Sequence, residues 1–135
     1  MLQYAEDQAV FAAKLAATLK NPRAPSVIIA SNSRVTMFTL RALKAAGVTI
    51  PADVSLVSFE EPEWGDLIAP PLTVVRHPTH EIATKAWEIL SGRIDKRPDP
   101  PRHVELSAEI FLGPSVAQVG RRPSRGRKAV PKAET

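Results

Sequence analysis

The sequence contains no cysteine, which excludes disulfide bonds and every reaction that depends on a thiolate. It has no apolar run near the ~18 residues of a membrane-spanning helix, and no secretory signal peptide opens it. Because disulfides are rare inside cells, the lack of cysteine is compatible with a cytoplasmic protein. We therefore expect a cytoplasmic protein without a membrane segment.

The motifs of common enzyme classes are missing as well. There is no glycine-rich phosphate loop and no Gly-x-Ser-x-Gly elbow. The adjacent carboxylates Glu60 and Glu61 are expected at a strand end, where neighbouring side chains point to opposite faces, so they cannot easily flank one glycosidic bond. We expect no catalytic residue and no enzyme activity.

A metal centre is not expected either. His77, His80 and Glu81 have a spacing that superficially resembles metal ligands, but Pro78 interrupts them at a helix entry and His103 is remote in sequence. A zinc site needs three or four convergent protein ligands. We therefore expect no metal and no cofactor.

The charge of the chain is concentrated at its end. With 135 residues, of which 44% are hydrophobic and 24% charged, the chain is typical of one small globular unit. From Gly120 onward six Arg and Lys side chains stand against Glu134, a net of +5, and subtracting this from the total of +4 leaves −1 for the body. We divide the chain into a folded domain at 1–117 and a basic tail at 118–135. Two readings of the tail stay open, a solvated disordered segment or an arm that touches nucleic acid weakly.

The first half of the chain has the pattern of a helix, a strand and a second helix. Phe11, Leu15 and Leu19 form one apolar row on a helix over Glu6–Leu19. The apolar run Ser26–Ala30 predicts a strand buried on both faces. A helix over Arg34–Ala46 follows, and Gly47 suits the left-handed residue after it.

The second half continues the alternation. Strands are predicted at Val54–Phe59 and Leu72–Arg76, with a helix from Thr79 to about Gly92 that turns Ile82, Ala83, Ala86, Trp87 and Leu90 inward. The proline-rich segment Asp95–Arg102 is predicted to be a loop, followed by short strands at His103–Leu106 and Glu109–Leu112. A helix between two buried strands is a βαβ unit, so the fold class is α/β with a parallel sheet flanked by helices.

Polar side chains follow two of the predicted strands. Asn32 and Ser33 come after the first strand, Glu60 comes after the second, and Trp64 lies in the loop beyond it. Ligands of open α/β sheets bind at the carboxyl ends of the strands, where these groups suit the hydroxyls and the apolar face of a sugar. We predict Asn32, Ser33, Glu60 and Trp64 as ligand-binding residues. The alternative is that Asn32 or Ser33 only caps a helix, Glu60 lies in a solvated loop and Trp64 packs against the domain.

A long ordered pattern runs from 47 to 73. Its residues, in order, are Gly47, Ile50-Pro51, Asp53, Val54 to Ser58, Phe59, Glu60-Glu61, Trp64 and Pro70-Pro71-Leu72-Thr73. This pattern resembles the effector-binding core of the LacI/GalR family of bacterial transcriptional repressors. The resemblance continues upstream through Pro25 to Ser33 and downstream to about Ser115. It implies part of a periplasmic-binding-protein-like (type I), Rossmann-like sandwich.

Several positions depart from the family pattern. Ser33 stands where an aspartate commonly grips effector hydroxyls, which implies weakened or altered binding because a serine lacks the charge of a carboxylate. Glutamates occupy Glu60 and Glu61 where aspartates are usual, and Ser58 occupies the place of a glycine. Gly113 replaces an arginine two residues before Ser115.

The resemblance also implies a function and partners. Such a domain binds a small effector, of the sugar or nucleoside class, and controls a DNA-binding helix-turn-helix headpiece that we do not find in this sequence. It implies a homodimer through the helix Arg34–Ala46, whose apolar residues lie on more than one face. It further implies that Leu72–Leu90 crosses into another lobe, which would leave Ile82, Trp87 and Leu90 exposed here. A sugar-binding module without a role in transcription, or a remnant of a split gene, are the alternatives.

Overall fold

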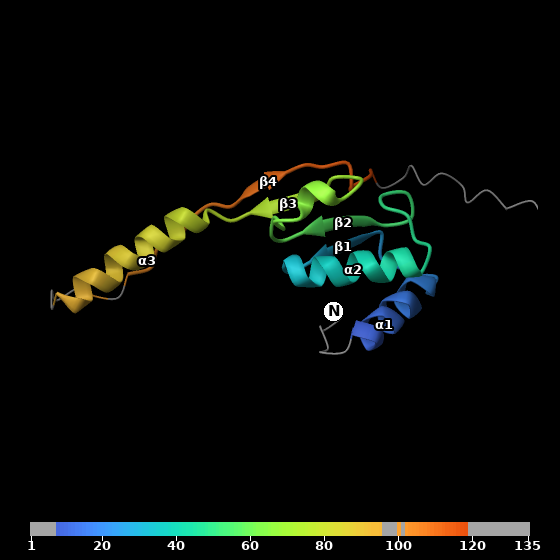
Figure 1. Ribbon diagram of the computed structural model, residues 1–135, viewed down its shortest axis with the longest axis horizontal. Helices are drawn as coiled ribbons and strands as arrows, with labels where there is room; N and C mark the ends of the chain where they lie inside the picture. The colour runs from blue at the N-terminus through green and yellow to red at the C-terminus, as the bar shows by residue number, and fades with distance from the viewer. Residues whose placement is uncertain (1–7, 96–99, 101, 119–135) are drawn as a thin grey trace, which may run out of the picture.

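The protein is described by a computed structural model that covers residues 8–95, 100 and 102–118 (Figure 1). The elements in chain order are α1 (Gln8–Lys20), β1 (Val27–Ala30), α2 (Ser33–Ala45), β2 (Ser55–Ser58), a short 3-10 turn η1 (Gly65–Leu67), β3 (Thr73–Arg76), α3 (Thr79–Ile94) and β4 (Glu109–Phe111). The sequence predicted every α-helix and all four strands to within a few residues at each end, and η1 was not foreseen.

The strands form one sheet in the order β1-β2-β3-β4. β1 pairs with β2 and β2 with β3 in parallel, and β4 is antiparallel to β3. In the register, Ala30 lies beside Ser58 and Ser58 beside Val74. The carboxyl ends of the first two strands therefore lie at the same edge, and the α/β class is confirmed.

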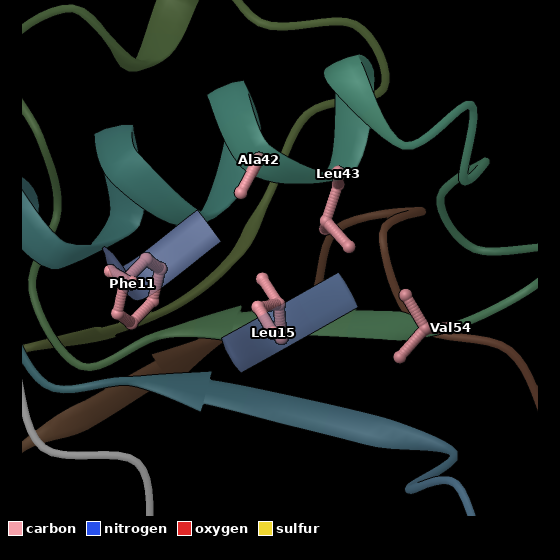
Figure 2. Close-up of a cluster of buried hydrophobic side chains, with 5 residues drawn as sticks. All are labelled: Phe11, Leu15, Ala42, Leu43 and Val54. Carbon is pink, nitrogen blue, oxygen red and sulfur yellow. The ribbon is translucent and has the colours of Figure 1, made fainter. Parts of the chain in front are cut away.

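Helices α1 and α2 cover one face of the sheet and form the main core with it. Figure 2 shows Phe11 and Leu15 of α1 facing Ala42 and Leu43 of α2, with Val54 beside them. A second cluster is contributed mainly by the strands and packs against Leu40 of α2; it consists of Ala30, Leu56, Leu72 and Val74. The chain thus buries a core on this side of the sheet.

The start and end of α2 follow from local chemistry. The Asn32 side chain accepts a hydrogen bond from the backbone N–H of Val35 and caps the first turn. Gly47 has a φ of 65°, the left-handed conformation predicted for it after the helix. Phe38 packs against the first core cluster and Leu40 against the second, so both apolar faces of α2 are used within this chain.

One expectation about β1 is wrong. The strand was predicted to be buried on both faces, yet Val27 and Ile29 are 44% and 64% exposed, whereas Ala30 on the opposite face is buried. The reason is that β1 is an edge strand and that α1 and α2 pack on only one side of it.

Helix α3 projects away from the sheet as an arm (Figure 1). None of its residues is buried, and within the described part of the chain no other helix or strand packs extensively against it. Ile82, Trp87 and Leu90 are 46%, 64% and 50% exposed, as the resemblance implied, and not turned into a core of this chain. The helix also continues past Gly92 to Ile94.

The segment after the arm corrects a second expectation. Residues His103–Leu106 were predicted as a strand but form none, because no strand pairs with them. They run beside α3 and line a shallow cavity of about 480 Å³ with Ile82, Lys85, Ala86 and Ile89. The predicted strand at Glu109–Leu112 is present as β4 and ends one residue earlier.

The last described segment closes the sheet between β2 and β3. The buried Ser115 donates a hydrogen bond from Oγ to the carbonyl of Leu56 at 2.6 Å and accepts one from the N–H of Thr73 at 2.7 Å. Gly113 bonds to the Thr73 side chain through both its N–H and its carbonyl. A Cβ at position 113 would lie 2.5 Å from the carbonyl oxygen of Leu72, so the glycine that replaces the family's arginine fits a close backbone approach.

Two sequence expectations lie wholly or largely outside the described residues. The tail at 118–135 is described only at Gln118, and the loop at Asp95–Arg102 only at its two ends and at Pro100. Within the described residues, no helix is long and apolar enough to cross a membrane.

Candidate functional site

The candidate site lies at the carboxyl edge of the parallel strands. Because β1 and β2 end side by side, the residues that follow them, Asn32 and Ser33 after one strand and Glu60 after the other, converge there. The convergence follows from the parallel pairing, because β1, β2 and β3 all have their carboxyl ends at the same edge of the sheet.

A contact between Ser33 and Glu60 joins the two strand ends. The backbone N–H of Ser33 donates to Oε2 of Glu60 at 2.6 Å. This hydrogen bond lowers the pKa of the Glu60 carboxyl, with further lowering by the Ser33 hydroxyl and by His77, against a smaller raising effect of desolvation. The carboxylate therefore stays charged at neutral pH and lies at the N-terminus of α2, where negative charge is favoured.

Asn32 has a different environment. Its Oδ1 accepts the N–H of Val35 at 2.9 Å, and it does not line the cavity described below. The geometry is that of the helix cap considered as the alternative from sequence. Its contribution here is to fix the first turn of α2, which aims the Ser33 N–H at Glu60.

Below this edge, a buried hydroxyl contact supports the Glu60 backbone. Ser58, at the end of β2, donates from Oγ to the Glu60 carbonyl at 2.5 Å and lies 2.8 Å from Oγ1 of Thr36 on α2. Thr36 Oγ1 in turn lies 2.8 Å from the Asn32 carbonyl. The serine that stands where the family has glycine thus has polar partners on the neighbouring helix and loop.

Glu61 points to a partner other than that of Glu60. Its two carboxylate oxygens accept from Nε and Nη2 of Arg76, at 2.5 and 2.6 Å. The bond to Arg76 lowers the pKa of Glu61 and raises that of Arg76. Glu60 and Glu61 are therefore bound to different groups, as expected for neighbours at a strand end.

His77 contacts the end of β2 through Phe59. Its Nε2 lies 3.0 Å from the carbonyl of Phe59, and its ring meets the Phe59 ring edge-on with the centroids 5.3 Å apart. This contact holds the residue after β3 against the end of β2.

These groups surround a cavity of about 530 Å³. It is lined by Ser33, Glu60, Glu61, Pro62, Glu63, Trp64, Arg76, His77 and Thr79. Of the residues predicted from sequence, Ser33, Glu60 and Trp64 line it together and Asn32 does not. The lining combines carboxylates, a guanidinium, a hydroxyl and an indole, which suits a polar ligand with an apolar face.

Sequence reasoning missed Arg76, His77 and Thr79. Arg76 is the last residue of β3, and His77 and Thr79 follow this strand as Ser33 and Glu60 follow β1 and β2. The predicted strand Leu72–Arg76 therefore held the signal, because a third parallel strand brings its own polar end to the shared edge. Within the described residues, no group of three or more His, Cys, Asp and Glu side chains is placed to hold a metal ion.

Comparison with known proteins identifies the family. Residues 2–116 match the model of the periplasmic binding protein-like domain. A probable opine utilization operon repressor of Rhizobium rhizogenes is 34% identical over 112 residues, 82% of this chain and 54% of that protein. A lactose operon repressor of Rhizobium radiobacter is 34% identical over 87 residues, 64% of this chain and 76% of that protein.

The fold agrees with this match. A LacI family transcriptional regulator from Enterococcus faecium, solved with bound ribose, superposes with a TM-score of 0.66 at 24% identity, over 78% of this chain and 39% of that one. The chain belongs to the family of periplasmic binding protein-like domains and is part of the effector-binding domain of a LacI-family transcriptional regulator. This is a non-enzymatic family, as the sequence predicted. The chain spans about half the length of its Rhizobium rhizogenes relative.

Proposed function

We propose that this chain senses a small polyhydroxylated effector, of the sugar or nucleoside class, in the cavity at the carboxyl edge of β1, β2 and β3. The observation that carries the proposal is the convergence of Ser33, Glu60 and Trp64 on one cavity of about 530 Å³. That size suits a monosaccharide or a nucleoside.

The chemistry of the lining supports a hydroxylated ligand. A charged carboxylate such as Glu60 accepts strong hydrogen bonds from hydroxyls, and the Trp64 indole offers an apolar face for a ring. Asn32 contributes by capping α2 and thereby fixing the position of Ser33. The solved regulator contains bound ribose and one relative is named a lactose operon repressor, which supports a sugar ligand, whereas another relative is named a probable opine utilization operon repressor.

The cavity would act within a larger regulator. In our proposal the effector shifts the balance between two conformations because it binds one of them more tightly, and a DNA-binding part of the regulator senses this change. The regulator would act in the cytoplasm as a homodimer with α2 at the interface, and the basic tail would touch DNA only weakly. Exposed Arg34, Arg41 and Lys44 on α2 leave a polar face for such an interface.

The test is a titration followed by Trp64 fluorescence. Trp87→Phe removes the second tryptophan, and ribose, galactose and adenosine are then added to the chain alone and to the chain joined behind the preceding part of the Rhizobium rhizogenes relative. A ligand of the right class should quench Trp64. Glu60→Ala should weaken the binding of that ligand by about 1–3 kcal/mol, because a charged hydrogen-bond partner is lost.

Glu88→Ala is the matched control, since Glu88 is an exposed carboxylate on α3 that pairs with Lys85 and does not line the cavity. Equal affinity of the wild type and Glu60→Ala would remove Glu60 from the site. Absence of any response in the joined protein across both ligand classes would refute the sugar or nucleoside assignment.

A further inference from the structure

One guanidinium group joins three segments of this chain. Arg76 is the last residue of β3, and it binds both carboxylate oxygens of Glu61 in the loop that lines the cavity. Its Cζ also lies 3.9 Å from the centroid of the Phe111 ring on β4. The cavity loop, β3 and β4 therefore meet at Arg76.

Both contacts depend on the shape of arginine. The planar fork of the guanidinium matches a carboxylate with two parallel hydrogen bonds, and its flat face stacks on an aromatic ring at the same time. Lysine offers a point charge and cannot make the paired bonds. Glu109, opposite Arg76 in the β3–β4 register, adds a second carboxylate that favours the charged form of Arg76.

Helix α3 leaves the sheet close to Arg76. The helix begins at Thr79, shortly after Arg76, and none of its residues is buried. No other helix or strand of the described chain packs extensively against it, and the segment that runs beside it leads back to β4, so the base of the arm lies at the paired ends of β3 and β4 (Figure 1). Arg76 therefore stands at the point of the chain where the arm leaves the sheet.

We propose that Arg76 is a positioning residue that holds the cavity loop in place through Glu61 and couples movement of this loop to the α3 arm. A ligand drawn to Glu60 and Trp64 moves the loop that carries Glu61, and the Glu61–Arg76 pair passes this displacement to the β3–β4 pair. The role of a ligand in driving the movement rests on the proposed function. The mechanical link itself is present without a ligand.

The two tryptophans of this chain report on the two ends of the link. Trp64 lies in the cavity loop and Trp87 on α3, where it is 64% exposed. Trp87→Phe leaves a reporter of the loop, and Trp64→Phe leaves a reporter of the arm. Acrylamide quenching and time-resolved anisotropy of the full chain then measure how freely each end moves.

Arg76→Gln should make Trp64 about twofold more accessible to acrylamide and should raise the amplitude of fast anisotropy decay of Trp87. Glu61→Gln should have the same two effects. Lys85→Gln is the matched control, because it removes the same charge and breaks the exposed Lys85–Glu88 pair within α3. It should leave the Trp64 signal unchanged.

Rescue separates a positioning role from ordinary packing. Glu61→Arg combined with Arg76→Glu restores the ion pair in reverse, and Glu109→Gln is added so that the new carboxylate at position 76 does not face a like charge across the β3–β4 pair. This variant should bring the Trp64 quenching part of the way back to the wild-type value, because the stacking on Phe111 stays lost. Arg76→Lys should give an intermediate value. The melting temperature should change little in all variants, because the pair is exposed.

Three outcomes would overturn the proposal. The first is Trp64 quenching in Arg76→Gln that equals the wild type, and the second is a change at Trp64 with none at Trp87. The third is a large drop in melting temperature that accompanies both signals and is not reversed by the swapped pair. No effector is added in any of these measurements, so failure here leaves the ligand proposal standing, and failure of the titration leaves this link standing.

Discussion

The carboxylate of Glu60 accepts a hydrogen bond from the backbone N–H of Ser33, 27 residues earlier in the chain, at 2.6 Å. The contact places a negative charge at the N-terminus of α2 and brings the ends of β1 and β2 together. Ser33 stands where the resemblance led us to expect an aspartate. Any residue at position 33 would offer this backbone N–H, but the Ser33 hydroxyl also lowers the pKa of Glu60, whereas an aspartate there would bring a second negative charge close to Glu60.

The pH dependence of stability should report this contact. The pKa of the Glu60 carboxyl is lowered in the folded state, chiefly by the hydrogen bond from the Ser33 N–H. The contact therefore stabilises the fold at pH values above the ordinary pKa of glutamate, about 4.3, and this stabilisation is lost as the pH falls through the lowered pKa. Urea unfolding at pH 7 and pH 3 should show a smaller loss of stability for Glu60→Gln than for the wild type.

Glu61 also has a lowered pKa, so Glu61→Gln is measured beside it. Glu105→Gln, which changes an exposed carboxylate remote from the sheet, is the control. Identical pH profiles for the wild type and Glu60→Gln would show that the Ser33 contact contributes nothing to the fold.

The hydroxyl of Ser115 should be worth more than that of a surface serine. It binds the Leu56 carbonyl and the Thr73 N–H in a fully buried position, and Ser115→Ala leaves both backbone groups without this partner. We expect a loss of about 2–4 kcal/mol in the free energy of unfolding, measured by urea denaturation. Ser107→Ala, at an exposed position, should change it by less than about 0.5 kcal/mol. Equal midpoints for the two variants would contradict the bridging role.

Two glycines should respond in opposite ways to alanine. A Cβ at Gly113 would press against the backbone of Leu72 and Pro71, so Gly113→Ala should destabilise the fold by about 1–3 kcal/mol. Gly92 lies in α3 with no atom near the position of a Cβ, so Gly92→Ala should be neutral or stabilise by about 0.5–1 kcal/mol. Thermal unfolding of both variants checks the pair, and a neutral Gly113→Ala would show that the chain relaxes around position 113.

The exposed apolar row on α3 should cause association. Ile82, Trp87 and Leu90 are large apolar side chains exposed on one helix, and exposed apolar surface of this kind favours association. We expect sedimentation velocity at micromolar concentration to show self-association, and Ile82→Gln with Leu90→Gln should shift the chain toward monomer. Val10→Gln, at an exposed position of α1, is the control and should not. A compact monomer with Trp87 protected from quencher would contradict the exposed arm.

The sequence determined the elements of this protein because their signals are local. The apolar runs around Val27–Ala30 and Ser55–Ser58 define strands within a few residues, and Gly47 ends α2 because it accepts a positive φ. The polar residues at the strand ends also identified the edge of the sheet where Ser33, Glu60 and Trp64 now line one cavity. The periods of helix and strand, and the steric freedom of glycine, act over a few residues and can be read directly.

Only the tertiary structure decided the partners. It assigned the Asn32 oxygen to the cap of α2, paired Glu61 with Arg76, placed Ser115 between β2 and β3, and left one face of β1 exposed. Each of these depends on the register of residues far apart in sequence or on which surfaces another segment covers. A hydrogen-bonding group has many candidate partners in a chain, and the choice among them is made when the strands are aligned and the helices pack.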